Sequence, residues 1–368
     1  MPPISVLIKP SSGNCNLRCA YCFYYDTMEK REKPSYGFMT EQTLEAVLRE
    51  VLSYAEGSCT IAYQGGEPTL SGLPFFEKSM ELQERYNVNH VKIFNAIQTN
   101  GYQINQDWAE FFKKHHFLVG VSLDGGPKQH DVYRKTPKGE GSFSQVMKHI
   151  ELLQKAGVEF NILSVVNGRT APHIRKNYAF YRKNHLDYLQ FIACLDPLGE
   201  TPGQKEYSLT PEAYGTFLIE LFDLWYADLL AGKQPFIRQF ENYIAMLLGQ
   251  MPESCDMRGI CGMQYVVEAD GAVYPCDFYV LDAYRLGNFL TDSVEVIDRK
   301  REEIGFIEES KQKEEACTGC RYEALCRGGC RRNRMEEQGH HQYFCESYQM
   351  FFDACLPRMM EIARNLQR

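Results

Sequence analysis

Three cysteines near the N-terminus have the spacing of a metal-binding loop. Cys15, Cys19 and Cys22 form a CxxxCxxC pattern directly after residues 4–9, whose apolar run predicts a strand. A four-iron cube with three cysteine ligands keeps one iron open, and an open iron can bind a small molecule, which a fully cysteine-ligated cluster cannot readily do. Zinc competes as a reading. The loop has no nearby His to complete a tetrahedral zinc site, although a residue distant in the sequence could supply the fourth ligand.

Eight further cysteines crowd the last third of the chain. They are Cys255, Cys261, Cys276, Cys317, Cys320, Cys326, Cys330 and Cys345. By count they allow two four-cysteine sites, but zinc ribbons also use paired cysteines, so spacing alone leaves zinc a serious alternative. We expect no secretion signal at the N-terminus, which makes a disulfide framework the weaker explanation for 14 cysteines. We expect Cys59, Cys194 and Cys355, which lie outside these patterns, to be small buried apolar residues.

Polar residues and glycines fall where predicted strands end. Gln64 lies at the end of one strand and Gly65-Gly66-Glu67-Pro68 follows it, Thr99-Asn100-Gly101 lies at the end of the next, and Ser122 and Asp124 lie at the end of a third. These positions form the functional rim in barrel-like folds. The glycine pair would let backbone groups approach a ligand, although a strand-ending turn would also explain it.

Repeated βα units must position these residues. Strands are expected at 4–9, 58–64, 90–99, 117–124, 158–166 and 187–195, and helices between them at 40–55, 74–86, 105–115, 142–156 and 171–184. The expected N-caps are Thr40, Asn105, Ser142 and Thr170, and the expected helix stops are Gly57 and Gly157. About six such units predict an α/β fold with a partial (β/α)6 barrel instead of a closed eightfold one.

The elements after the barrel lead into the cysteine-rich region. Helices are expected at 211–232, with an aromatic stripe that faces the core, and at 238–248. Residues 265–274 predict a hairpin, because Asp270-Gly271 supplies a turn that tolerates positive φ.

Charge and hydropathy narrow the choice of partners. The 368 residues carry a net charge of −8, so a nucleic-acid backbone is not an expected partner. No stretch approaches the roughly 18 uninterrupted apolar residues of a membrane span, and we expect a cytoplasmic protein with no membrane partner.

The CxxxCxxC loop, with Tyr21 before its last cysteine, resembles the signature of the radical S-adenosylmethionine superfamily. The resemblance implies a [4Fe–4S] cluster on Cys15, Cys19 and Cys22 that binds S-adenosylmethionine and generates a 5′-deoxyadenosyl radical. It also implies a set of S-adenosylmethionine contacts, in which Ser122 and Arg134 suit the methionine carboxylate. The set is Tyr21, Gln64, Gly65, Gly66, Glu67, Ser122, Arg134 and Leu195. Arg134 could equally be a solvated charge.

The C-terminal array CxxCx5CxxxC, with Cys345 after it, resembles the SPASM extension of peptide-modifying radical enzymes. That resemblance implies two auxiliary [4Fe–4S] clusters, hence three in all. The first would use Cys255, Cys261, Cys276 and Cys330, and the second Cys317, Cys320, Cys326 and Cys345. The expected domains are a radical S-adenosylmethionine partial barrel at 1–234 and a SPASM domain at 235–368. The basic run from Arg327 to Arg334 fits a counter-charge to thiolate clusters better than a nucleic-acid patch.

Within this group the whole chain resembles the anaerobic sulfatase-maturating enzymes, on LIKPSSGNCNLRCAYCFY, YQGGEPTL, QTNG, GVSLDG, QFIACLDP, FDLWY, VVEADGAVYPCDFYVL, RLGN and CRGGCRR. The resemblance implies oxidation of a Cys or Ser in an unfolded or nascent sulfatase polypeptide to formylglycine, with a flavodoxin or ferredoxin as electron donor. It implies Asp277 as the catalytic base. The other reading of Asp277 is a residue that caps a local turn.

Two other functions stay open at this point. A SPASM enzyme could instead install thioether crosslinks in a ribosomal peptide, but many such enzymes carry a peptide-recognition domain before the radical core, and Cys15 comes too early for one. The eight C-terminal cysteines would also permit a non-catalytic zinc or iron–sulfur module.

Overall fold

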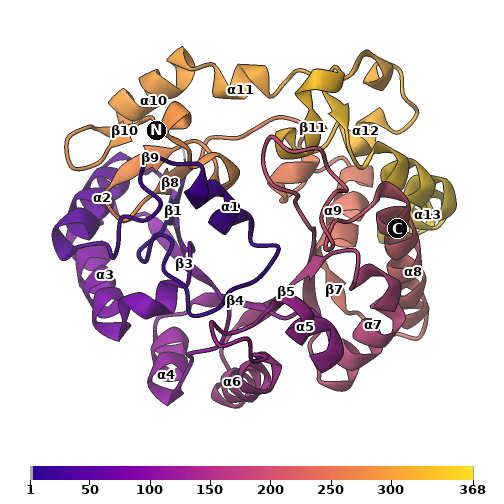
Figure 1. Cartoon of the computed structure of the whole chain (residues 1–368), viewed down its shortest axis with the longest axis horizontal. Helices are drawn as coiled ribbons and strands as arrows, with labels where there is room; N and C mark the ends of the chain where they lie inside the picture. The colour runs from indigo at the N-terminus through magenta and orange to yellow at the C-terminus, as the bar shows by residue number, and fades with distance from the viewer. Residues whose placement is uncertain (1–2, 368) are drawn as a thin grey trace. The chain divides into compact units, whose positions relative to one another are not determined.

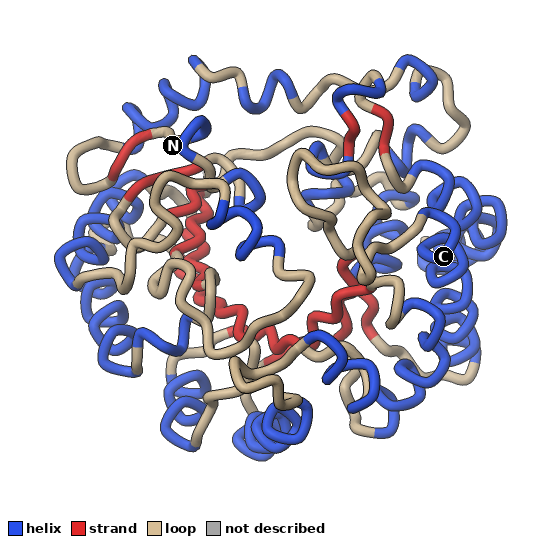
Figure 2. Tube along the Cα trace, in the orientation of Figure 1, coloured by secondary structure: helices blue, strands red, loops and turns tan. Residues whose placement is uncertain are grey.

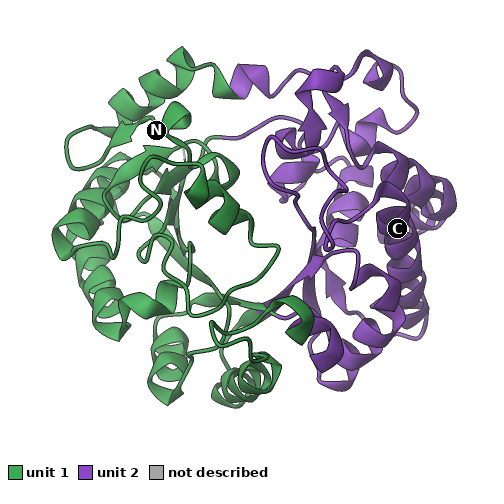
Figure 3. Ribbon diagram, in the orientation of Figure 1, with its two compact units in different colours: residues 1–122, 131–160, 263–306 green, residues 123–130, 161–262, 307–368 purple. Residues whose placement is uncertain are grey.

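The computed structural model describes residues 3–367, which fall into two units (Figure 3). The first unit comprises residues 1–122, 131–160 and 263–306, and the second comprises 123–130, 161–262 and 307–368. Each unit therefore draws on distant parts of the chain. The division into sequence domains at residue 234 remains a prediction.

The strand before the three-cysteine loop lies inside the sheet of the first unit. That sheet has the order β10-β9-β8-β1-β2-β3-β4, and β1 to β4 run parallel. The strands are β1 (Ile4–Ile8), β2 (Ser58–Tyr63), β3 (Lys92–Thr99), β4 (Leu118–Ser122), β8 (Tyr265–Val267), β9 (Ala272–Tyr274) and β10 (Gly287–Asn288). The predicted strands are confirmed to within two residues at each end. Figure 2 shows the strands of the chain in red.

Helices cover this sheet on both faces. They are α1 (Phe23–Glu29), α2 (Glu41–Tyr54), α3 (Leu73–Tyr86), α4 (Gln106–Lys114), α6 (Phe143–Ala156) and α10 (Val294–Glu303), with 3-10 turns η1 (Pro68–Ser71), η4 (Asp277–Tyr279) and η5 (Asp282–Tyr284). In Figure 1, α1 lies on the opposite side of the strands from α2 and α3. The sequence did not predict α1, nor the short helix α5 (Pro127–Tyr133).

Capping follows the sequence at three of the six predicted positions, while α2 ends at its C-cap Ala55 instead of at Gly57 and Thr170 makes no side-chain cap bond. Thr40 Oγ1 accepts a hydrogen bond from the Thr43 amide, and Asn105 Oδ1 accepts one from the Trp108 amide. Gly157 ends α6 in the left-handed conformation, with φ +66°. Ser142 occupies an N-cap position, but its hydroxyl donates to the Arg134 carbonyl oxygen instead of accepting from the helix.

The second unit combines three parallel strands with long helices. Its strands are β5 (Phe160–Val166), β6 (Tyr188–Ala193) and β7 (Phe236–Ile237), followed by a small sheet of β11 (Arg334–Met335) and β12 (His341–Gln342). Its helices are α7 (Ile174–Lys183), α8 (Pro211–Leu230), α9 (Arg238–Leu247), α11 (Phe306–Glu309), α12 (Glu323–Cys326) and α13 (Cys345–Leu366), with 3-10 turns η2 (Ala171–His173), η3 (Cys255–Met257), η6 (Glu315–Cys317), η7 (Arg331–Asn333) and η8 (Glu336–Gln338). The predicted stripe on α8 is core: Phe217, Leu221 and Trp225 are buried, and α8 packs on α13.

The predicted hairpin forms and has a second role. β8 and β9 pair antiparallel around Gly271, whose φ is +86°. On its other edge β8 pairs in parallel with β1, as Val6 with Tyr265 and Ile8 with Val267, which the sequence did not reveal. The segment after the hairpin is thereby brought beside the strand that leads to the cysteine loop. Within residues 3–367 no helix is long and apolar enough to cross a membrane.

Candidate active site and iron–sulfur ligands

The three N-terminal cysteines share one loop between β1 and α1. Cys22 is the N-cap residue of α1, and its amide donates to the Cys19 carbonyl oxygen at 3.1 Å. All three cysteines are half-buried residues. Burial and the nearby charges of Glu67 and Cys22 raise the pKa of Cys15 to about 11. The loop therefore carries all three predicted ligands of the catalytic cluster within eight residues.

The two glycines after β2 are needed because this segment runs against the cysteine loop. The Gly66 amide donates to the Ser12 carbonyl oxygen at 2.7 Å, and the Glu67 amide donates to that of Asn14 at 2.8 Å. A Cβ on Gly66 would lie 2.1 Å from the Asn14 oxygen, and Gly65 has φ +139°. Any side chain here would displace the loop that carries Cys15.

Glu67 is fully buried, and its carboxylate accepts hydrogen bonds from neighbouring residues of the chain. Its oxygens accept hydrogen bonds from Thr69, from the Thr99 hydroxyl at 2.7 Å and from the Asn100 amide at 2.7 Å. Burial raises the pKa of Glu67 in spite of these hydrogen bonds. The Asn100 side chain in turn donates to Cys15 Sγ at 3.7 Å. Glu67 therefore holds the end of β3 against the cysteine loop, and its predicted contact to S-adenosylmethionine remains a prediction.

Residues predicted to bind the methionine carboxylate are buried. Arg134 is 6% exposed, which does not fit a solvated surface charge, and its guanidinium carbon lies 5.5 Å from the centre of the Tyr21 ring. Ser122 Oγ accepts a hydrogen bond from Gln98 at 3.3 Å. In the second unit, Leu195 follows β6 and is half-buried. The roles of these residues in binding S-adenosylmethionine remain predictions.

Asp277 is held by two residues from the ends of neighbouring strands. It opens η4 directly after Cys276, its carboxylate forms an ion pair with Lys9, and Gln64 Nε2 donates to its Oδ2 at 2.8 Å. Sequence reasoning placed Gln64 on S-adenosylmethionine and did not single out Lys9. No sequence signal singled out Lys9, because a lysine after an apolar strand is ordinarily exposed.

The seven predicted auxiliary ligands of the second unit form two groups. Burial and the charges of Cys255 and Cys261 raise the pKa of Cys330 to about 12. Burial and the charges of Cys345, Cys317 and Cys320 raise the pKa of Cys326 to about 11. Each group contains cysteines that the SPASM resemblance assigns to one cluster. Cys276 lies in the first unit, and its assignment to the first auxiliary cluster remains a prediction.

The spacing of the side chains bears on the zinc alternative. Within residues 3–367, no three His, Cys, Asp or Glu side chains gather closely enough to hold a single metal ion. A zinc site would need its ligands about 2.0–2.3 Å from one ion. Spacing alone therefore does not separate zinc from an iron–sulfur cluster at these cysteines.

The basic run predicted as a counter-charge has several partners. Arg334 is buried and donates to the carbonyl oxygens of Gly259, Ser310, Gln312, Gly328 and Gly329. Burial lowers its pKa, whereas the thiolates of Cys330, Cys261, Cys317 and Cys326 raise it. Arg331 forms an ion pair with Glu309, and Arg332 donates to the Asp196 carbonyl oxygen. The run therefore organises the cysteine loops as well as facing their charge.

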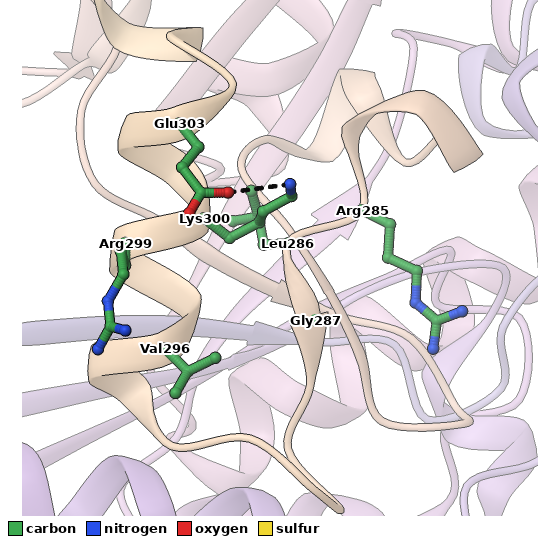
Figure 4. Close-up of a pocket in the computed structure, with 7 residues that line it drawn as sticks. All are labelled: Arg285, Leu286, Gly287, Val296, Arg299, Lys300 and Glu303. Carbon is green, nitrogen blue, oxygen red and sulfur yellow. Dashed lines mark hydrogen bonds and ion pairs between the residues drawn. The ribbon is translucent and has the colours of Figure 1, made fainter.

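A pocket of about 380 Å³ opens elsewhere on the first unit (Figure 4). It lies between α10 and the segment that enters β10, and Lys300 and Glu303 form an ion pair across one helix turn at 3.1 Å. The residues that line it are Arg285, Leu286, Gly287, Val296, Arg299, Lys300 and Glu303. None of them belongs to the predicted site.

Comparisons with known proteins agree with this geometry. The profile of the Radical SAM superfamily matches residues 10–180, and that of the SPASM iron-sulfur cluster-binding domain matches residues 259–321. The chain is 45% identical to a cysteine-type anaerobic sulfatase-maturating enzyme of Clostridium perfringens, with 100% of both chains covered. It is 32% identical to a serine-type enzyme of Bacteroides thetaiotaomicron, with 99% of this chain and 92% of that one covered.

Solved structures show the same likeness. Native anSMEcpe with bound AdoMet and Cp18Cys peptide superimposes with a TM-score of 0.94 at 46% identity, covering 99% of this chain and 100% of that one. Streptococcus suis SuiB bound to precursor peptide SuiA, at 17% identity and TM-score 0.65, shares the fold. The predicted α/β fold with a SPASM subdomain and the predicted [4Fe–4S] and S-adenosylmethionine cofactors are thereby confirmed. The chain belongs to the anaerobic sulfatase-maturating enzymes, a family of radical S-adenosylmethionine enzymes with a SPASM domain.

Proposed function

We propose that this protein oxidises an active-site Cys or Ser of a sulfatase polypeptide to formylglycine. The observation that carries the proposal is the full-length likeness, at TM-score 0.94, to an enzyme whose solved structure holds both AdoMet and a peptide. Cysteine is the proposed preferred substrate, because identity to the cysteine-type relative is 45% and to the serine-type relative 32%.

Cys15, Cys19 and Cys22 would hold the catalytic cluster, with S-adenosylmethionine on its open iron. When bound, these cofactors supply the 5′-deoxyadenosyl radical that abstracts a hydrogen atom from substrate. The chain's own residues position the partners of this step. Glu67 and Asn100 hold the end of β3 to the cysteine loop, and Ser122 and Arg134 would bind the methionine carboxylate.

Asp277 is the proposed proton acceptor. After a hydrogen atom leaves the substrate Cβ, an aldehyde-level product requires the loss of one more electron and of the thiol or hydroxyl proton. The Asp277 carboxylate is held by Lys9 and Gln64 and is partly exposed, so it could take this proton. Its neighbour Cys276 belongs to the predicted ligand set of an auxiliary cluster.

The substrate must be extended at the modified residue, because a radical inside a barrel cannot reach a packed core. An unfolded or nascent sulfatase is therefore the proposed partner, with a flavodoxin or ferredoxin as electron donor. The cytoplasm is the proposed location, because eleven ligand thiols would have to stay reduced. The two profile matches fall inside residues 1–234 and 235–368, which supports the proposed domains.

The test is anaerobic incubation of the iron-loaded protein with S-adenosylmethionine, a reductant and an unfolded sulfatase-motif peptide that contains Cys. The expected products are 5′-deoxyadenosine and a peptide that reacts with a hydrazide probe and is identified by mass spectrometry. A Ser peptide run in parallel tests the preference, with slower aldehyde formation expected. Folded sulfatase should not be turned over. No aldehyde from either peptide would contradict the proposal, and a product that has lost two hydrogens without reacting with hydrazide would favour crosslinking.

A further inference from the structure

Lys9 is a fully buried lysine directly after β1. Its amide donates to the Val267 carbonyl oxygen at 2.8 Å, which fixes its backbone beside the hairpin strand β8. A buried ammonium is costly unless it is paired. Its side chain forms an ion pair with Asp277 and lies 3.9 Å from the centre of the Tyr24 ring.

The other acid near Tyr24 is already neutralised. Glu268 forms an ion pair with Arg31 at 2.8 Å, both side chains are fully buried, and the Tyr24 hydroxyl donates to the same carboxylate. Among the ion pairs of the described residues, Lys9 takes part in the one with Asp277. The positive charge of Lys9 is therefore directed at Asp277.

Both oxygens of the Asp277 carboxylate contact another side chain. Lys9 holds Oδ1, and Gln64 donates to Oδ2 at 2.8 Å. Lys9 and Gln64 directly follow β1 and β2, which pair in parallel with Ile8 opposite Tyr63. The Asp277 side chain is 15% exposed, so a small part of it remains open to a substrate.

We propose that Lys9 is a positioning residue that fixes the orientation of the Asp277 carboxylate toward the substrate. The inference rests on the proposed role of Asp277. Lys9 directly follows β1, a strand inside the sheet, so its backbone is well ordered. Its ion pair therefore restricts the movement of Asp277, which lies on the short 3-10 turn η4. Gln64 alone would leave one oxygen free, and the carboxylate could then rotate about its terminal bond.

The experiment compares Lys9→Met with Lys9→Gln, which keeps a donor without the charge. The matched control is Lys30→Met, which removes an exposed lysine paired with Asp26 at 2.6 Å. For each variant we would measure iron content, 5′-deoxyadenosine formation and the aldehyde formed per 5′-deoxyadenosine. Lys9→Met should keep iron and 5′-deoxyadenosine but lower the aldehyde ratio about tenfold or more. Lys9→Gln should recover part of that ratio, and Lys30→Met should match the parent protein.

A double-mutant cycle shows whether Lys9 acts through Asp277. In an Asp277→Asn background, Lys9→Met should have no further effect on the aldehyde ratio, because residues that act as a unit are non-additive. Independent effects in this cycle, or an unchanged ratio in Lys9→Met, would overturn the inference. Loss of iron in both Lys9 variants would also overturn it, since Lys9 would then be structural. Failure of the base role itself would appear separately, as normal product from Asp277→Asn alone.

Discussion

The side-chain amide of Gln64 donates a 2.8 Å hydrogen bond to the carboxylate of Asp277, 213 residues further along the chain. One partner follows β2 and the other opens the turn after the β8–β9 hairpin. The contact joins two motifs that the sequence shows only as separate segments. It gives Asp277 a defined place beside the loop that carries Cys15, Cys19 and Cys22.

Replacing Asp277 by Asn should separate radical formation from product formation. The variant should keep iron and 5′-deoxyadenosine formation, but aldehyde should fall by roughly 10²–10⁴, as expected when a general base is lost. Mass spectrometry of the peptide and chromatography of 5′-deoxyadenosine measure the two products. Asp282→Asn is the control, because Asp282 is exposed five residues further on. Unchanged aldehyde would remove Asp277 from the mechanism, whereas loss of iron would make its role structural.

Replacing Cys15, Cys19 and Cys22 together by Ala should abolish cleavage of S-adenosylmethionine. About two thirds of roughly twelve iron atoms should remain, because the other eight predicted ligands would still hold two four-iron clusters. Iron analysis after anaerobic purification measures this, and dominant zinc in the parent protein would contradict the cluster assignment. Changing Cys59, Cys194 and Cys355 to Ala is the control, because these three thiols are buried and none belongs to the predicted ligand sets. Continued cleavage in the first variant would rule out the assignment of the loop.

Replacing Asn100 by Ala should lower the reduction potential of the catalytic cluster. The Asn100 side chain donates to Cys15 Sγ at 3.7 Å, and hydrogen bonds to ligand sulfurs help to set cluster potentials. A redox titration followed by electron paramagnetic resonance measures the shift. Asn95→Ala is the matched control, because Asn95 lies on β3, the strand that Asn100 directly follows, but its side chain bonds to Gln83 and not to a ligand sulfur. Equal potentials for the two variants would show that the Asn100 contact does not tune the cluster.

His149 should make the protein less stable as pH falls below about 6.5. Burial lowers its pKa, its Nδ1 contacts the Gly101 carbonyl oxygen at 2.7 Å, and its Nε2 contacts Gln145. Between the folded and unfolded pKa values the unfolded chain binds more protons, so the free energy of unfolding rises with pH across that window. Thermal unfolding at pH 5.5 and 7.5 should show a smaller difference for His149→Gln than for the parent. An identical difference would mean that His149 does not contribute.

Local features could be read from the sequence because neighbouring residues determine them. The caps at Thr40 and Asn105, the left-handed stop at Gly157 and the turn at Gly271 each depend on a few adjacent residues. The cysteine loop was predictable for the same reason, since its three thiols lie within eight residues. Alternation of apolar runs with amphipathic stretches indicated the strands and most helices of both units.

Tertiary structure alone decided the surroundings of Asp277 and Glu67. The pairing of β8 with β1 could not be read from either segment, because each is an ordinary apolar strand whose partner is selected by packing across the whole sheet. That pairing places Lys9 and Gln64 on Asp277 across more than 200 residues. Likewise, the sequence shows Glu67 only as part of a motif. The folded chain brings Thr69, Thr99 and Asn100 to its carboxylate as hydrogen-bond donors. A buried charge must find its partners wherever the fold supplies them.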